Sequence, residues 1–298
     1  MTASAVVLDA VNTPAPVKKN KSPHYNRMSP LSYVVLILMV LISCFPFYWM
    51  FVCASSTPDV IAKVPPAIVP GNNFMREIHK ILEVNPDFPR SMFNTLFVAS
   101  TIAVSQVIFS SVAGFAFAKL RFKGKGRLLT FIVITLMLPA QLGLVPLFKM
   151  MGDFHWIDSY KALIIPGCVT AFGVFWMRQV IDSQIPKELI EAASIDGASI
   201  PRIYRSVIVP AILPSAFVLG LFSFLASYND FLWPLLVLQS PKNFTVQVAI
   251  TNLNTEAYGT DYNIVLAGSF LATVPLLILF IFVGRRMVTG VMEGAVKG

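Results

Sequence analysis

The sequence predicts an all-α membrane protein with six transmembrane helices and one long polar loop on its cytoplasmic face. Only 13% of the 298 residues are charged and 56% are hydrophobic, whereas a soluble domain carries about 25% charged residues. The mean hydropathy is +0.71, which also indicates a membrane protein. The hydrophobic residues gather into six runs close to the ~20 residues that cross a bilayer.

The chain begins with residues 1–30, which are polar, basic and rich in proline and lysine. They contain no apolar run that would make a cleavable signal peptide. We expect a disordered basic tail there, followed by one transmembrane domain over residues 31–298. Its first span runs from Leu31 to about Ala54 without a charge, and a proline-rich connection follows, with one amphipathic helix expected over Met75–Leu82.

The second span, about Met92 to Ala118, is rich in Ala, Ser and Gly, which let helix backbones approach closely in lipid. The third, about Leu128 to Phe148, contains Pro139 and Gly143. A proline in a spanning helix removes one hydrogen bond and kinks the helix, so we expect a kink there.

The fourth, fifth and sixth spans run over about 162–180, 212–238 and 264–283. The fourth contains Pro166 and Gly167, and the fifth contains Asn229 and Asp230. The long polar stretch between the fourth and fifth spans, about residues 182–214, is the loop introduced above.

Basic residues predict the orientation, because loops on the cytoplasmic side are enriched in Lys and Arg. Six spans place both termini on one side. That side would carry 16 of the 23 Lys and Arg residues, in the tail, in loop 119–127, in the stretch 182–214 with its flanks, and after the sixth span. We therefore expect both termini and the 182–214 loop in the cytoplasm. The net charge of +8 then follows from topology and does not indicate nucleic-acid binding.

The 182–214 loop has the pattern of two short helices joined by a glycine turn. Pro186 suits a helix start, and Leu189, Ala192 and Ala193 fall on one narrow apolar face with little side-chain bulk. Gly197 can take the left-handed conformation that ends a helix. A second helix is expected from Ser199 and Pro201. Because long loops usually have a function, we expect an interaction site on this face, although an ordinary interhelical loop is the alternative.

Several stretches of this sequence resemble one family. Glu191-Ala192-Ala193, Asp196-Gly197-Ala198 and the prolines of Val209-Pro-Ala-Ile-Leu-Pro214 look like the "EAA" signature of permease subunits of bacterial ATP-binding-cassette importers. The resemblance extends from about residue 31 to the end. It is strongest to the carbohydrate branch, in particular to the shorter of the two permeases of maltose-type systems, through Gly114-Phe-Ala-Phe-Ala-Lys-Leu-Arg-Phe-Lys-Gly124 and Tyr228-Asn-Asp-Phe-Leu-Trp-Pro234.

This resemblance implies a type I importer permease fold in the bacterial inner membrane, half of a sugar pathway, and coupling to a separate ATPase dimer. The implied partners are a second homologous permease and an extracytoplasmic solute-binding protein. The coupling residues would be Glu191, Ala192, Ala193, Asp196, Gly197 and Ala198. Tyr204 stands where many relatives have phenylalanine.

No catalytic or cofactor site is expected in the chain itself. It lacks the G-x-x-x-x-G-K-[ST] phosphate loop, since Gly124-Lys125-Gly126 has neither the spacing nor the hydroxyl residue. ATP and magnesium would therefore be bound by the partner ATPase. The three histidines and three cysteines are scattered, so no metal site is expected.

Possible substrate contacts in the pathway are Asn229, Asp230, Trp233 and Asn94. A carboxylate within a span costs about 3 kcal/mol to insert and should face a cavity or a partner, and an indole can stack on a sugar ring. The alternative is that these side chains hold helices together, and the same two roles are open for Gln141.

Two other classes of protein fit less well. A secondary transporter would need inverted repeats and several charges within the membrane, and a membrane enzyme would need clustered catalytic residues. A polyol or glycerol-phosphate-type solute stays open as an alternative to a sugar.

Overall fold

The computed structural model describes residues 29–61, 68–253 and 262–295, and in these ranges every regular element is helical. The chain divides into two compact units, residues 1–48 and 49–298. The predicted tail, residues 1–28 in particular, lies outside the described residues. Within these described residues, five helical stretches are long and apolar enough to cross a membrane, and a bent helix pair makes a sixth candidate span.

The first elements of the chain are α1 (Pro30–Ser55), α2 (Pro58–Ile61) and α3 (Phe74–Val84). Helix α1 carries no charge, as predicted for the first span, and it passes from the first unit into the second. Helix α3 confirms the amphipathic helix expected over Met75–Leu82, and it packs against α14 (Tyr262–Ala295) through the inward-facing Ile81.

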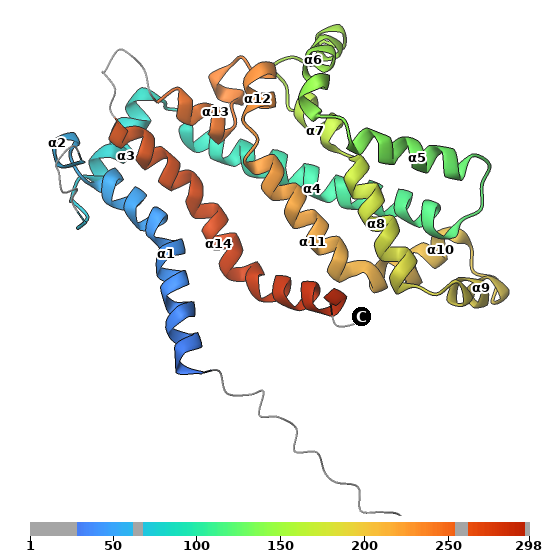
Figure 1. Ribbon diagram of the computed structural model, residues 1–298. Helices are drawn as coiled ribbons and strands as arrows, with labels where there is room; N and C mark the ends of the chain where they lie inside the picture. The colour runs from blue at the N-terminus through green and yellow to red at the C-terminus, as the bar shows by residue number, and fades with distance from the viewer. Residues whose placement is uncertain (1–28, 62–67, 254–261, 296–298) are drawn as a thin grey trace, which may run out of the picture. The chain divides into compact units, whose positions relative to one another are not determined.

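Helix α4 (Phe88–Lys119) is the central span of the second unit and packs against α8 (Ala171–Gln184) and α11 (Val209–Tyr228) (Figure 1). Helices α4 and α8 run parallel in one register. Their contacts pair Gln106 with Thr170, Ser110 with Gly173, Gly114 with Met177, and Lys119 with Asp182. A Cβ on Gly173 would lie 2.4 Å from Ser110 Oγ, and one on Gly114 would lie 2.8 Å from Met177 Cβ. Glycine at both positions therefore allows this close helix contact.

The third span is broken more sharply than the predicted kink. Helix α5 (Lys125–Leu136) ends before Pro139, a 3-10 turn (η1) covers Ala140–Gly143, and α6 (Leu144–Asp153) continues at 100° to α5. The fourth span also consists of two helices, α7 (Lys161–Gly167) and α8, separated by residues 168–170.

The rest of the chain contains the predicted loop helices and the last span. Helix α9 (Lys187–Ile195) and α10 (Ile200–Ile203) are followed by a π-helical turn, η2 (Tyr204–Ile208), and by α11. Beyond α11 come α12 (Leu232–Val237), the 3-10 turn η3 (Pro241–Asn243), α13 (Val246–Thr251) and α14. The predicted fifth span is therefore wrong in its bounds, because its helix starts at Ile200 and ends at Tyr228.

Candidate functional site

The two-helix loop has the glycine turn that the sequence predicts. Gly197 has φ of +77°, in the left-handed region that favours glycine. The N–H of Ala198 donates to the carbonyl of Ala193 at 3.0 Å, and the N–H of Gly197 donates to that of Ser194 at 3.1 Å. These two bonds form a Schellman motif, which satisfies the free carbonyls at the end of α9. Asp196 is the C-cap residue of the helix.

The apolar face predicted from Leu189, Ala192 and Ala193 is divided in the structure, because only Ala193 of these residues packs inward. Ile190 and Ala193 are half-buried and pack with Ala198 on the core formed by α4, α8 and α11. Leu189 and Ala192 are exposed. The sequence offered apolar residues on both sides of this helix, so periodicity alone could not show which side faces inward.

The outward face of α9 consists of Glu188, Glu191, Ala192 and Ile195, at the spacing i, i+3, i+4, i+7 that shares one side of a helix. All four residues are exposed, and Ile195 is 86% exposed. Sequence reasoning missed Ile195. The α9 outward face thus combines two carboxylates, one small residue and one large exposed apolar side chain.

The second loop helix is the beginning of the fifth span and is not a separate element. Residues 200–228 form one helix of 29 residues, and Pro210 lies within it. The π turn lies just before Pro210, and Val209 donates to the carbonyl of Tyr204. Helix α10 is therefore continuous with α11, without an intervening loop.

Polar and aromatic contacts also join this loop to α4. The hydroxyls of Ser111 and Tyr204 are hydrogen-bonded at 2.6 Å, and the rings of Phe115 and Tyr204 lie 5.8 Å apart. Around these contacts Ile181, Ile203 and Ile208 are buried in one core. The loop is thus packed on α4, α8 and α11.

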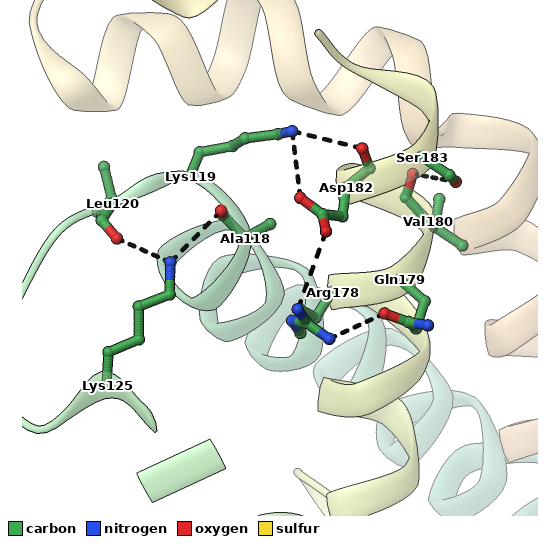
Figure 2. Close-up of polar contacts among 9 residues, drawn as sticks. All are labelled: Ala118, Lys119, Leu120, Lys125, Arg178, Gln179, Val180, Asp182 and Ser183. Atoms are coloured by element: carbon green, nitrogen blue, oxygen red, sulfur yellow. Dashed lines mark hydrogen bonds and ion pairs between the residues drawn. The ribbon is translucent and has the colours of Figure 1, made fainter. Parts of the chain in front are cut away.

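A charged cluster fixes the end of α8, from which α9 continues (Figure 2). Lys119 Nζ lies 3.5 Å from Asp182 Oδ1, and Arg178 Nη2 lies 3.8 Å from Asp182 Oδ2. The Lys119 side chain is 3% exposed, whereas that of Asp182 is 43% exposed. Lys125 donates to the carbonyls of Ala118 and Leu120, which joins the start of α5 to the end of α4.

Two of the four possible substrate residues use their donors inside the protein. Asn94 donates to the carbonyls of Lys242 and Phe244, both at 3.0 Å. The Trp233 indole N–H donates to the Ala162 carbonyl at 2.9 Å. Pro166 cannot supply an N–H to that carbonyl four residues earlier, so Trp233 takes the place of the missing helix bond. Both side chains therefore hold helices together, which is the alternative role considered above.

The other two, Asn229 and Asp230, lie in the connection between α11 and α12. Asn229 is exposed and donates to the carbonyl of Leu225 at 2.8 Å. Asp230 accepts from the backbone N–H groups of Phe231, Leu232 and Trp233. It also borders a small cavity of about 20 Å³, which is space for about one water molecule. Asp230 therefore follows the spanning helix α11, which ends at Tyr228. The prediction that Asp230 lies within the fifth span is wrong.

A hydrogen-bonded cluster that sequence reasoning missed centres on Asp158, in the loop between α6 and α7. Its carboxylate accepts from the N–H groups of Gln239 and Ser240, both at 2.9 Å, and from the Ser240 hydroxyl. Burial alone would raise the pKa of Asp158, but the hydrogen bonds from Ser240 and Gln239 outweigh it and lower the pKa to about 2. The cluster joins two loops about 80 residues apart in sequence, at the end of the molecule away from α9.

Comparison with known proteins gives consistent matches. The family model "Binding-protein-dependent transport system inner membrane component" matches residues 106–291. The arabinooligosaccharides transport system permease protein AraQ of Halalkalibacterium halodurans is 38% identical over 205 residues, covering 69% of this chain and 73% of that protein. The lactose transport system permease protein LacG of Rhizobium radiobacter is 32% identical over 267 residues, with 90% and 96% covered.

A third relative and one solved structure complete the comparison. The sn-glycerol-3-phosphate transport system permease protein UgpE of Brucella abortus is 31% identical over 270 residues, covering 88% of this chain and 95% of that protein. A crystal structure of a bacterial ABC transporter involved in the import of the acidic polysaccharide alginate contains a chain with a TM-score of 0.72 and 22% identity, covering 86% of this chain and 94% of that one. The predicted all-helical importer-permease fold is confirmed by this likeness.

Proposed function

Because this chain belongs to the family of inner membrane components of binding-protein-dependent transport systems, we propose that it forms half of the pathway of an ATP-driven sugar importer. Its α9 would dock on a separate ATPase subunit. The chain has no catalytic role of its own in this proposal, and ATP and magnesium belong to the ATPase. A second permease and an external solute-binding protein complete the importer.

The observation that carries the coupling role is the form of the α9 loop. Helix α9 is held on one side by Ile190 and Ala193, and it presents the α9 outward face on the other. The Schellman turn at Gly197 directs the chain back into a helix that is continuous with α11. A force applied to α9 would therefore reach the membrane spans through the Gly197 turn and the continuous helix that follows it. Glu191, Ala192, Ala193, Asp196, Gly197 and Ala198 remain the proposed coupling residues.

The distribution of basic residues supports a cytoplasmic position for this loop and for both termini. The loop between α4 and α5 and the α9 region carry Lys119, Lys123, Lys125 and Lys187, with several arginines. A bilayer favours such residues on the cytoplasmic side. The Asp158 cluster would then face the outside, where the binding protein delivers its solute.

A neutral sugar fits the membrane spans better than a phosphate ester does. The stretches 91–118, 128–148, 162–177, 209–228 and 262–284 contain no Lys or Arg. An anionic solute would need cationic donors along its route, since phosphates are held by Arg and Lys. The carbohydrate names of AraQ and LacG agree with a sugar, and the UgpE relatives supply the second candidate, sn-glycerol 3-phosphate.

The test is uptake by the complete importer in membrane vesicles, with a panel containing arabino-oligosaccharides, lactose and sn-glycerol 3-phosphate. ATP-dependent uptake of a sugar that requires all partner subunits is the expected result. Uptake restricted to sn-glycerol 3-phosphate would establish the second candidate instead. Solute uptake by this chain alone, driven by an ion gradient, would overturn the coupling role.

A further inference from the structure

Two neighbouring spans are interrupted at the same depth. Helix α5 has 12 residues and α8 has 14, so at 1.5 Å per residue they are about 18 Å and 21 Å long. The start of α5 and the end of α8 lie at one level at the α9 end, because Lys125 bonds the end of α4 and Lys119 pairs with Asp182 in the last turn of α8 (Figure 2). The hydrocarbon core is about 30 Å thick. Both interruptions therefore lie inside it.

Most residues of the two interruptions are exposed on this chain. All residues from 137 to 143 are exposed, and so are Val169 and Thr170 in the second interruption. Helices α5 and α8 pack against each other, which brings the two spans side by side. Non-helical backbone within the hydrocarbon does not face lipid, because its N–H and C=O groups would lack partners, so it faces either protein or water.

Uncharged polar side chains lie at this same depth. Gln106 is 13 residues before Lys119 on the unbroken α4, or about 20 Å from the α9 end, and donates to Thr170 Oγ1 at 2.6 Å. Thr170 also accepts from the N–H of Gly173 at 3.1 Å. Gln141 is exposed in the first interruption, and its side-chain amide has no hydrogen-bond partner in the described part of the chain. These groups are neutral donors and acceptors at one level.

The opposite side of α4 provides a contrast. Val104, Val107 and Ile108 line a groove of about 880 Å³ between α4, α11 and α14, and every lining residue is apolar. The groove has regular helix on all sides and no interruption. It matches lipid or an apolar partner helix. The interrupted side also exposes apolar side chains, Met137, Leu138 and Leu142, and it differs from the groove in its broken helices and in the polar side chains Gln106, Gln141 and Thr170.

Resting on the proposed importer function, we infer that the solute passes along the interrupted side, and that residues 137–143 and 168–170 line a water-filled segment of its pathway. Gln141 and the exposed backbone groups there offer hydrogen bonds to a neutral, hydroxyl-rich solute. This site is distinct from Asn94 and Trp233, whose donors are bound inside the protein.

The experiment measures thiol accessibility in the complete importer, reconstituted in vesicles. Cys44, Cys53 and Cys168 are first replaced by alanine. Single cysteines are then introduced as Gln141→Cys and Val169→Cys, with Val104→Cys as the matched control, since Val104 is 60% exposed at a similar depth on unbroken helix. The probe is a charged, membrane-impermeant methanethiosulfonate, and variants are compared only where ATP-dependent transport is retained.

We expect the cysteines at 141 and 169 to react faster than the one at 104 by roughly tenfold or more, because the thiolate and the charged reagent both need water. Equal rates at all three positions would overturn the inference, because the interrupted side would then be no more accessible to water than unbroken helix. No reaction at 141 and 169 would also overturn it and would place partner protein over the interruptions. Sugar uptake measured on the same vesicles is a separate readout. Transport with inaccessible cysteines would refute only the pathway assignment, and accessible cysteines without sugar uptake would refute only the substrate class.

Discussion

The turn at Gly197 permits a quantitative prediction, through the series Gly197→Asn, Gly197→Ala and Gly197→Val. No heavy atom lies within 4 Å of a Cβ placed on Gly197, so these substitutions cause no clash with the rest of the chain. Their effect comes from the backbone alone, which stands at φ of +77°. Asparagine tolerates this conformation, alanine less so, and β-branched valine least.

The expected magnitude follows from the turn itself. The two Schellman hydrogen bonds contribute about 1 kcal/mol each. A left-handed L-residue costs roughly 1–2 kcal/mol, and valine more. The penalty for valine therefore cancels the stabilisation by both bonds, and the ordered turn should fall from nearly full occupancy to about half or less. Asparagine should leave most of the turn intact.

Two measurements check this series, co-purification of the ATPase and ATP-dependent uptake, both normalised to the amount of inserted subunit. Both should decrease in the order Gly, Asn, Ala, Val, with equal insertion throughout. A Gly197→Val importer that transports as well as the parent would refute the role of the turn. The backbone explanation would also fail if Gly197→Asn were as defective as Gly197→Val.

Three further predictions concern other parts of the molecule. Ala192→Trp should abolish co-purification of the ATPase because it places a bulky ring on the α9 outward face, whereas Ala192→Ser should retain it; equal binding by both variants would exclude this face. Asp182→Asn should lower the thermal stability of the purified complex more than the double variant Lys119→Met, Asp182→Asn does. The reason is that the Lys119 side chain is 3% exposed, and leaving it without its carboxylate partner costs about 1–3 kcal/mol of stability. Additive effects of the two substitutions would contradict this. Asp158→Asn should destabilise the loop cluster by about 1.5–3 kcal/mol. Because the pKa of Asp158 is lowered from 3.8 to about 2, its carboxylate stabilises the fold above pH 3.8, so the stability difference between variant and parent should be constant at neutral pH and decline as the pH falls from about 4 to 2. A stability difference that grows on acidification would refute the assignment.

The sequence predicted best those features that depend on neighbouring residues. The glycine turn, the bounds of α9 and the amphipathic α3 follow from residues within one or two helical turns of each other, and the structure has them. The apolar length of the spans predicted their number for the same reason. Local chemistry decides these features, so one sequence suffices to find them.

The features that it did not predict depend on contacts between distant residues. Trp233 donates to a carbonyl that Pro166 leaves free, across 71 positions of sequence, so an aromatic residue that looked like a sugar platform holds two helices together. Asp158 draws its three donors from residues 239 and 240. The inward side of α9 is set by the core beneath Ile190 and Ala193, which periodicity could not reveal in a helix with apolar residues on both sides.

The breaks in the third and fourth spans depend both on local residues and on contacts with distant ones. Pro139 and Pro166 indicated weak points, but a proline alone permits either a kink or a complete break, and neighbouring groups decide between them. At Pro166 the Trp233 indole satisfies the free carbonyl, and α7 continues to Gly167. At Pro139 the free carbonyl of Thr135 accepts only from the N–H of Leu138 at 3.3 Å among the described residues, without a side chain from another helix, and the helix axis turns by 100°. The difference places the sharper break on the side where we expect the solute, at the depth where α8 also begins.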